Sequence, residues 1–285
     1  MSKNSANLHK FNDLAFAIIG DEGLTNFGIV KGADGSALLI DADIRRIDEI
    51  DDGLRRAGCT RVKYLLNTHE NFDHSSANHY FEKNGAVIIG SDGCWEALQL
   101  DGDAKFAEMA GREPGLKSRY PDLKMGQLQL TFAKSMTIRL PGVEVQVLHS
   151  AHNGKSHSLG DSIACIERDR LLFAGDLLYT RYHPVTVYGD IPNWICSIDH
   201  LMTQSFASVV PGHGPVSEGA EAYKAAFAEF RVYLNDFHQR LLEIKDGKKS
   251  PGDVETHMKS GAYARMGKTY MVKRNIEYFL KQGLS

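Results

Sequence analysis

Short apolar runs separated by Gly and Asp open the chain. They cover residues 14–20, 26–32 and 36–43, and this pattern predicts a meander of strands. Residues 45–58 then repeat apolar side chains at steps of three and four and end at Gly58, which predicts a helix. Further strands are predicted at 62–68 and 86–91, followed by a helix at 92–100.

The second half of the chain has a similar rhythm of strands. The predicted strands are 128–133, 136–141, 143–150, 161–167, 170–176 and 207–214. Several strands in both halves run straight into polar loops that carry His or Asp, at Thr68, Ser150, Gly175 and Pro211. Chemistry-bearing residues are therefore expected where strands end.

Two segments depart from this rhythm. Residues 101–126 are polar, contain Gly and Pro and are weakly periodic, so we expect an inserted, partly helical and mobile cap or lid. From Glu221 onward, apolar residues recur at steps of three and four: Tyr223, Phe227, Phe230, Leu234, Phe237, Leu241 and Ile244. This stripe predicts a helix docked on the core rather than a dimer seam, and residues 270–283 predict a terminal helix. We expect a main domain at 1–218 and a helical segment at 219–285 packed on it.

Composition and charge narrow the functional class. The 285 residues are 42% hydrophobic and 24% charged with a net charge of −3, and no basic cluster indicates a nucleic-acid partner. The four scattered cysteines indicate reduced thiols rather than a disulfide framework. There is no secretion signal and no apolar run of membrane-spanning length. These features predict a soluble, cytoplasmic protein with no membrane partner.

The candidate chemistry lies in the loops after the strands. Zinc and similar ions are held by imidazoles and carboxylates that converge from different loops. His69, Asp73 and His74 share the loop 65–78 at the spacing of metal ligands. Further candidates stand at later strand ends, among small residues that let a loop turn tightly: His157, Asp176 and His213. The joint pattern is far more specific than any one of these residues.

These positions resemble the metallo-β-lactamase superfamily. The HxHxDH motif of the family matches His69, Asn71, Asp73 and His74, and its later His, its Asp in a GD turn and its final GHG His match His157, Asp176 and His213. The family's opening hairpin and strand-ending Asp match up to Asp41. The resemblance covers roughly 14–216 and implies an α/β fold, an αββα sandwich with metals at one edge of the two sheets.

The resemblance also implies ligand sets. The first metal site would use His69, position 71 and His157; the second would use Asp73, His74 and His213; Asp176 would bridge them. The expected cofactor is Zn²⁺, as one or two ions, although iron or manganese would also suit these ligands. Asp73 would be both a ligand and the catalytic group that orients the attacking water or accepts its proton.

Asn71 departs from the family pattern, because it stands where a histidine is expected. An amide oxygen is a poorer zinc donor than imidazole. The first site then either fills weakly, with Asn71 or a water completing the shell, or stays empty while Asn71 hydrogen-bonds water or substrate. A third possibility is an inert relic.

Four other residues near the motifs have weaker assignments. His149 and His152 flank the His157 loop and could supply a replacement ligand, although surface loop positions suit them better. His183 follows the Asp176 strand and is a candidate for contact with substrate. Glu70 is expected to point away from the metals, because its neighbours must point toward them.

The expected function is hydrolysis of an acyl, ester, lactone or thioester bond in a small molecule by a metal-bound hydroxide. The fold also hosts other chemistry. An iron-dependent oxidoreductase, a phosphodiesterase and a non-catalytic metal-binding protein therefore stay open as alternatives, and a homodimer is compatible with the sequence.

Overall fold

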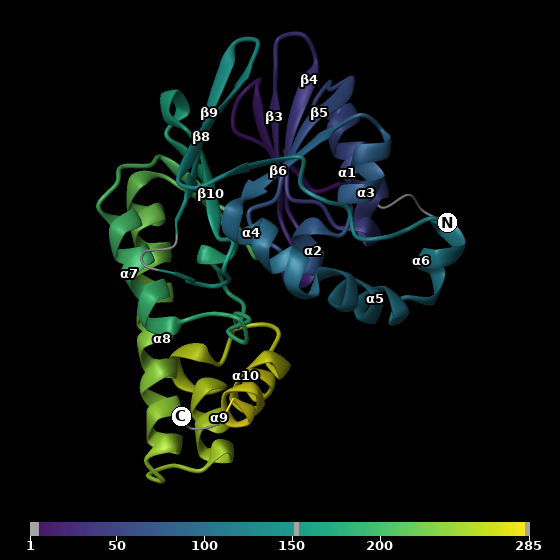
Figure 1. Ribbon diagram of the computed structural model, residues 1–285. Coiled ribbons are helices and arrows are strands. Elements are labelled where there is room, and N and C mark those ends of the chain that lie inside the picture. Colours follow the sequence, from purple (N-terminus) through teal and green to yellow (C-terminus); the bar gives the residue numbers. More distant parts are fainter. Residues whose placement is uncertain (1–5, 151–153, 283–285) are drawn as a thin grey trace.

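The computed structural model describes residues 6–150 and 154–282. In this part of the chain two β-sheets pack face to face, and helices cover the outer face of each sheet (Figure 1). The layer between the sheets is made of buried aliphatic and aromatic side chains from both, such as Val30 and Leu38 from the first and Val147 and Phe173 from the second. This arrangement confirms the expected αββα sandwich.

The first sheet contains seven strands within the described residues, in the order of the chain. They are β1 (Leu8–Lys10), β2 (Ala15–Ile18), β3 (Phe27–Lys31), β4 (Ser36–Ile40), β5 (Arg61–Leu66), β6 (Val87–Ser91) and β7 (Leu130–Phe132). Strands β1 to β4 are antiparallel neighbours, and β4 to β7 are parallel neighbours. The antiparallel part is the meander that the sequence predicts.

The second sheet contains six strands within the described residues, ordered β13-β12-β11-β10-β9-β8. They are β8 (Ser135–Leu140), β9 (Val143–His149), β10 (Ser162–Ile166), β11 (Leu171–Phe173), β12 (Ser208–Val210) and β13 (Ser217–Glu218). One expectation is wrong: the run 128–133 does not open the second half but forms β7, which pairs with β6 in the first sheet. An alternating pattern predicts a strand but not its partner.

Helices on the first sheet pack through one buried cluster. They are α1 (Ile47–Arg56), α3 (Asn78–Lys83), α4 (Asp92–Ala97), α5 (Asp103–Gly111) and α6 (Pro114–Arg119), with a π-helical turn at Leu98–Gly102. Helices α5 and α6 lie in the segment 101–126, and their Phe106, Ala110 and Leu116 are buried. The segment is thus partly helical and anchored by apolar contacts, and its mobility stays a prediction.

Helices α7 (Ile191–Met202) and α8 (Ala220–Lys245) form the outer layer on the second sheet. Helices α9 (Pro251–Met258) and α10 (Tyr270–Lys281) lie below the sheets, beside the lower part of α8 (Figure 1). All seven residues of the predicted stripe are buried on α8, and they pack with Trp194 and Ile198 of α7, a helix that the sequence did not predict. Single turns of 3₁₀-helix lie at Asp21–Gly23, Ile44–Arg46, Glu167–Asp169, Gly175–Leu177 and Gly261–Tyr263.

The 26-residue helix α8 is long, but it is amphipathic rather than uniformly apolar. Neither it nor any other helix in the described ranges combines the length and the hydropathy of a membrane span.

Replacing Phe237 of α8 with Ala should destabilise the fold by about 3–5 kcal/mol, because a fully buried ring is removed from the cluster of α7, α8 and the second sheet. Val232 is 60% exposed on the same helix, so Val232→Ala should change stability by less than about 0.5 kcal/mol. Urea unfolding of both variants measures the difference. Equal stabilities would place the stripe outside the core.

Candidate metal centre

The loop after β5 folds so that its motif residues point to one place. His69 follows the strand by three residues, and the short helix α2 (Phe72–Ser75) turns Asp73 and His74 toward it. Asn71 stands at the N-terminus of α2 with extended backbone. The rings of His69 and His74 lie 4.1 Å apart between centroids, and both side chains are buried.

Three more residues reach the same place from the second sheet. His157 lies in the loop between β9 and β10, Asp176 in the 3₁₀ turn after β11, and His213 after β12. The parallel strands β4 and β5 of one sheet, and β11 and β12 of the other, end at a common edge. Open α/β sheets bind ligands outside the carboxyl ends of their strands. The candidate ligands meet at this edge.

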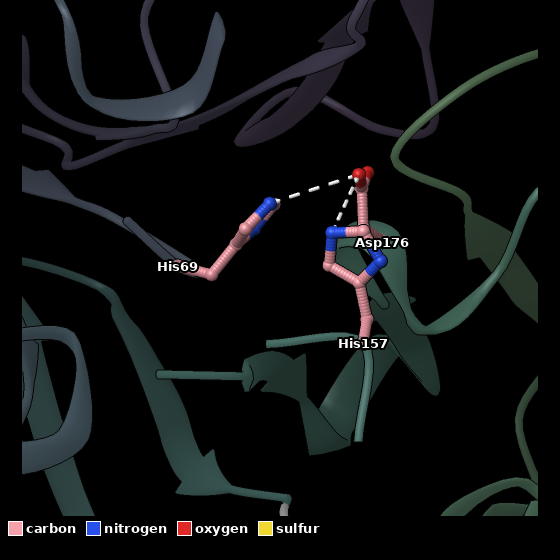
Figure 2. Close-up of side chains that lie close together, drawn as sticks. All are labelled: His69, His157 and Asp176. Carbon is pink, nitrogen blue, oxygen red and sulfur yellow. Dashed lines mark ion pairs between the residues drawn. The ribbon is translucent and has the colours of Figure 1, made fainter. Parts of the chain in front are cut away.

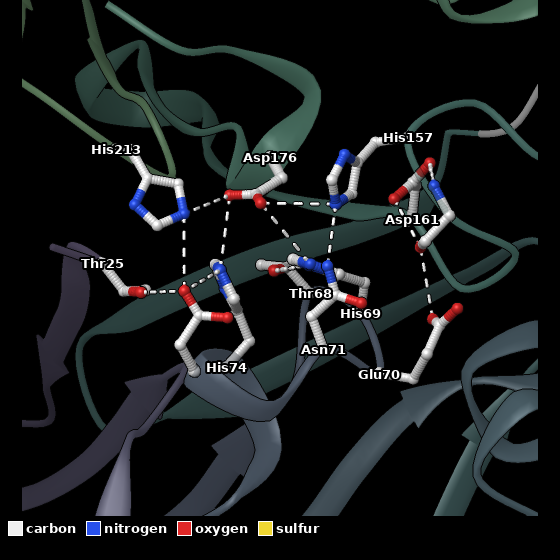
Figure 3. Close-up of polar contacts among 12 residues, drawn as sticks. Thr25, Thr68, His69, Glu70, Asn71, His74, His157, Asp161, Asp176 and His213 are labelled. Carbon is white, nitrogen blue, oxygen red and sulfur yellow. Dashed lines mark hydrogen bonds and ion pairs between the residues drawn. The ribbon is translucent and has the colours of Figure 1, made fainter. Parts of the chain in front are cut away.

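The carboxylate of Asp176 lies between two pairs of histidines. Its Oδ2 is 3.6 Å from Nε2 of His69 and 3.3 Å from Nε2 of His157 (Figure 2). Its Oδ1 is 3.3 Å from Nε2 of both His74 and His213 (Figure 3). Asp73 joins the second pair, with Oδ2 3.5 Å from Nε2 of His213.

Several polar atoms of this cluster lack hydrogen-bond partners. Within the described residues, Nε2 of His69, Nε2 of His74 and Oδ1 of Asp176 are buried and accept or donate no hydrogen bond. Buried polar atoms are rarely left unpaired in proteins, and such exceptions mark sites for ions or ligands. Two groups have the compactness of metal sites: His69, His157 and Asp176, and Asp73, His74 and His213. The residues therefore fit divalent metal ions.

Burial gives His69 and His157 the neutral state that ligands need. It lowers the pKa of His157 to about 4 and holds that of His69 well below its usual value, so both imidazoles are neutral. At His74, in contrast, the charges of Asp176, Asp41 and Asp73 outweigh burial and raise the pKa well above its usual value, so a metal ion would displace a proton there. Burial opposes ionisation of Asp176, but His213 and the other histidines around it outweigh this and keep its pKa well below the ordinary value. A carboxylate beside neutral imidazoles is a ligand set for zinc or iron.

Outer hydrogen bonds fix the orientation of the imidazoles. Nδ1 of His74 lies 2.9 Å from Oδ2 of Asp41, which also accepts from the Thr68 hydroxyl at 2.7 Å. Nδ1 of His213 donates to the Gly23 carbonyl at 2.8 Å. These bonds turn Nε2 of each ring toward Asp176 and make that nitrogen a stronger metal ligand. The backbone of Asp41 is left-handed, at φ 61°, and that geometry turns its carboxylate into the bond network.

Asn71 lies beside the first group of ligands. Its Nδ2 is 3.0 Å from Nε2 of His157, and it lines the cavity above the site. The two ends of an amide are exchanged by a simple rotation of the group, so either the oxygen or the nitrogen can face an ion at this position. Both interpretations of Asn71, as a weak ligand and as a hydrogen-bond partner, stay compatible with this placement.

Sequence reasoning missed Tyr179. Its hydroxyl donates to Oδ2 of Asp176, and its ring stacks on that of His213 with centroids 4.8 Å apart. No local pattern marks this residue, since a tyrosine three positions after the GD turn equally suits a core position. It extends the candidate site by one hydrogen-bonding group.

A second missed feature holds the His157 loop. Glu70 points away from the ligands, as expected, and accepts from the backbone N–H of Gly160 at 3.2 Å, with its Oε2 also 3.2 Å from the Ser158 hydroxyl oxygen. Asp161 accepts from the N–H and the hydroxyl of Ser158 at 2.8 and 2.7 Å. Burial raises the pKa of Asp161 to about 8. The carboxyl groups of Glu70 and Asp161 thus hold Ser158, the residue that follows His157, in place.

The other described histidines lie outside the cluster. His183 is buried, its Nδ1 lies 3.0 Å from the Tyr233 hydroxyl, and it is not among the residues that line the cavity. Its ring is held by Tyr233 of α8, away from the residues that line the cavity, and its contact with substrate stays a prediction. His149 ends β9, and His152 lies outside the described residues.

A cavity of about 430 Å³ opens above the cluster. Asp73, Asp176 and His213 reach its floor, while α5 supplies Lys105, Phe106 and Met109 on one side. The C-terminal segment supplies the other side: Lys268, Tyr270, Met271 and Arg274. The cavity thus connects the candidate metal centre with both segments that depart from the two-sheet pattern.

Solved structures of similar fold were found. A metallo-beta-lactamase from Pontibacter korlensis matches with a TM-score of 0.60 at 17% identity, over 81% of this chain and 99% of that chain. DIM-1 metallo-beta-lactamase matches with a TM-score of 0.58 at 14% identity, over 79% of this chain and 98% of that chain. The stereoselective inverting sec-alkylsulfatase Pisa1 from Pseudomonas sp. matches with 0.72 at 14%, over 99% of this chain and 51% of that chain, so this chain spans about half its length.

The family model of the metallo-beta-lactamase superfamily matches residues 20–213. That range includes every motif position from His69 to His213 and the strands of both sheets except β1, β2 and β13. The chain belongs to the metallo-beta-lactamase superfamily.

Proposed function

We propose that the protein is a metal-dependent hydrolase that cleaves an acyl, ester, lactone or thioester bond in a small molecule. Membership of the superfamily supports a metal-dependent hydrolase. The observation that carries the proposal is the position of Asp176, which turns one carboxylate oxygen toward each pair of histidines.

In this proposal His69 and His157 would hold a first ion with Oδ2 of Asp176. Asp73, His74 and His213 would hold a second with Oδ1. Zn²⁺ suits these nitrogen and oxygen donors, as do iron and manganese. Ions held in this way supply a nucleophile from water near neutral pH and polarise the bond that is cleaved.

Asp73 is the best candidate for the group that orients the attacking water and accepts its proton. The Thr25 hydroxyl donates to Oδ2 of Asp73 at 2.6 Å and fixes the carboxylate beside His213. The Asp73 side chain is still 31% exposed, on the floor of the cavity where a substrate would lie. A general base must reach the proton that it abstracts, and this position allows it.

Two features weaken the first ligand group relative to the second. Asn71 offers an amide where an imidazole would be a stronger donor. Oδ2 of Asp176, which faces this group, also accepts the hydrogen bond from Tyr179, so its electron density is shared. The second group has two imidazoles and the Asp73 carboxylate in addition to Oδ1. We infer that the second site is the tighter one.

A sulfate ester is a second candidate for the bond that is cleaved. The match to the sec-alkylsulfatase extends over 99% of this chain, whereas the metallo-beta-lactamases from Pontibacter korlensis and DIM-1 match about four fifths of it. The helical region α7–α10 is thus shared in shape with a sulfatase. The cavity volume favours a small substrate for either bond.

A panel of chromogenic ester, lactone, thioester, lactam, phosphodiester and sulfate ester substrates tests the function. Turnover should appear with added Zn²⁺, Mn²⁺ or Fe²⁺, disappear after chelation and return when metal is restored. His213→Ala should lose at least about a hundredfold in rate, because it removes a ligand of the tighter site. His257→Ala, at an exposed histidine that does not line the cavity, is the matched control. Metal-independent turnover, or full activity in His213→Ala, would contradict the proposal.

Replacing Asn71 with His should raise metal occupancy of the first site. Imidazole restores a strong donor beside His157, and a gain of about tenfold in affinity corresponds to ~1.4 kcal/mol. Titration of metal-free protein measures both sites, and wild type should hold fewer than two full equivalents. Asn71→Ala is the control and should not tighten binding. Two equally tight metals in wild type, unchanged by the substitution, would show that the shell is already complete.

A further inference from the structure

Lys268 lies in the wall of the cavity, in the loop between α9 and α10. It is half-buried, and its ammonium group forms no ion pair with a carboxylate of the described residues. Three other cations of the same wall do have acidic partners: Arg45 contacts Asp43, Lys105 lies 2.9 Å from Asp101, and Arg112 contacts Glu108. Buried charges in proteins are usually paired, so the position of Lys268 requires an explanation.

The negative charges that act on Lys268 are those of the candidate metal centre. Burial lowers the pKa of its ammonium group and Arg45 adds to this lowering, while Asp73 and Asp176 partly offset it. With metal bound as proposed, these two carboxylates would be ligands, and the ions would offset their negative charge. Lys268 is then a cation on the cavity wall with no compensating anion from the described residues.

The backbone holds Lys268 in one place. Its φ of 53° is in the left-handed region, which non-glycine residues adopt rarely. The preceding Gly267 is fixed by two hydrogen bonds: its N–H donates to the Arg181 carbonyl at 2.9 Å, and its carbonyl accepts from the His183 N–H at 3.1 Å. This bridge ties the loop to the segment that follows Asp176.

Close packing extends the bridge to the metal centre. The ring of Tyr182 lies against Gly267 and Gly23 so tightly that a Cβ at these glycines would stand 2.4 and 2.6 Å from it. The carbonyl of Gly23 in turn accepts the hydrogen bond from Nδ1 of His213. Lys268 is thus held at a fixed place relative to the second ligand group.

We propose that Lys268 binds an anionic group of the substrate, a carboxylate or a sulfate, while the bond to be cleaved lies at the metal centre. The inference rests on the proposed function and names the substrate class: a small anionic ester or acyl compound. Arg274, exposed on the same wall and without an ion pair in the described part of the chain, adds positive charge at the cavity mouth.

Lys268 would act by positioning and selection. A charge-assisted hydrogen bond from an ammonium group to an oxyanion is about twice as strong as a neutral one. Partial burial strengthens it further, because water screens it less. A neutral substrate of the same size would leave the ammonium unpaired, so the site discriminates between anionic and neutral compounds.

Calorimetric titration of glutarate and, separately, of inorganic sulfate into the zinc-loaded protein tests the proposal without requiring turnover. Lys268→Met should weaken binding of at least one of these anions about tenfold or more, while Lys268→Arg should keep most of the affinity. The anion whose affinity falls more in Lys268→Met, glutarate or sulfate, identifies the group that Lys268 prefers. Where turnover is found, the Lys268→Met loss should appear for 4-nitrophenyl hemiglutarate and be absent for the neutral 4-nitrophenyl pentanoate.

The matched control is Lys273→Met, which makes the same change at an exposed, paired lysine on α10 that does not line the cavity. Its anion binding should equal that of wild type. Metal content and thermal unfolding of each variant check that the site is intact, and Lys268→Gln replaces Lys268→Met if the latter loses zinc. Equal anion affinities in wild type and the uncharged variants, or no anion binding in wild type at millimolar concentration, would overturn the proposal even if the protein hydrolyses esters.

Discussion

The carboxylate of Asp176 lies between two pairs of histidines, and the arrangement of the whole site depends on it. Oδ2 faces His69 and His157, and Oδ1 faces His74 and His213, with all four contacts between 3.3 and 3.6 Å. Such a concentration of buried polar groups is costly unless each atom has a partner. The outer bonds from Asp41, Thr68, Tyr179 and the Gly23 carbonyl supply partners on one side, and the side left over is where metal ions would bind.

Much of this arrangement could be predicted because short segments of the sequence contain the motifs that form it. A strand followed directly by a His- or Asp-bearing loop is visible locally, so the six candidate ligands could be named before their distances were known. The αββα sandwich followed from the same motifs by resemblance. The stripe on α8 followed from helical periodicity alone, since an apolar face must be buried against something.

What could not be predicted depends on contacts between distant parts of the chain. The sequence pattern of β7 resembles that of any other strand, and only its pairing with β6 shows that it belongs to the first sheet. Tyr179 and Asp161 gain their roles from Asp176 and Ser158, which no spacing rule connects to them. His183 shows the converse: its sequence position near Asp176 suggested the cavity, but α8 binds its ring through Tyr233. The direction of a loop side chain is decided by tertiary packing.

Anomalous X-ray scattering from crystals of the protein grown with zinc tests the central claim most directly. A strong peak is predicted among Asp73, His74, His213 and Oδ1 of Asp176, and a weaker peak of lower occupancy among His69, His157 and Oδ2. The asymmetry follows from the stronger donors of the second group. Crystals in which these side chains are ordered but neither position scatters anomalously would contradict the assignment of the site as a metal centre.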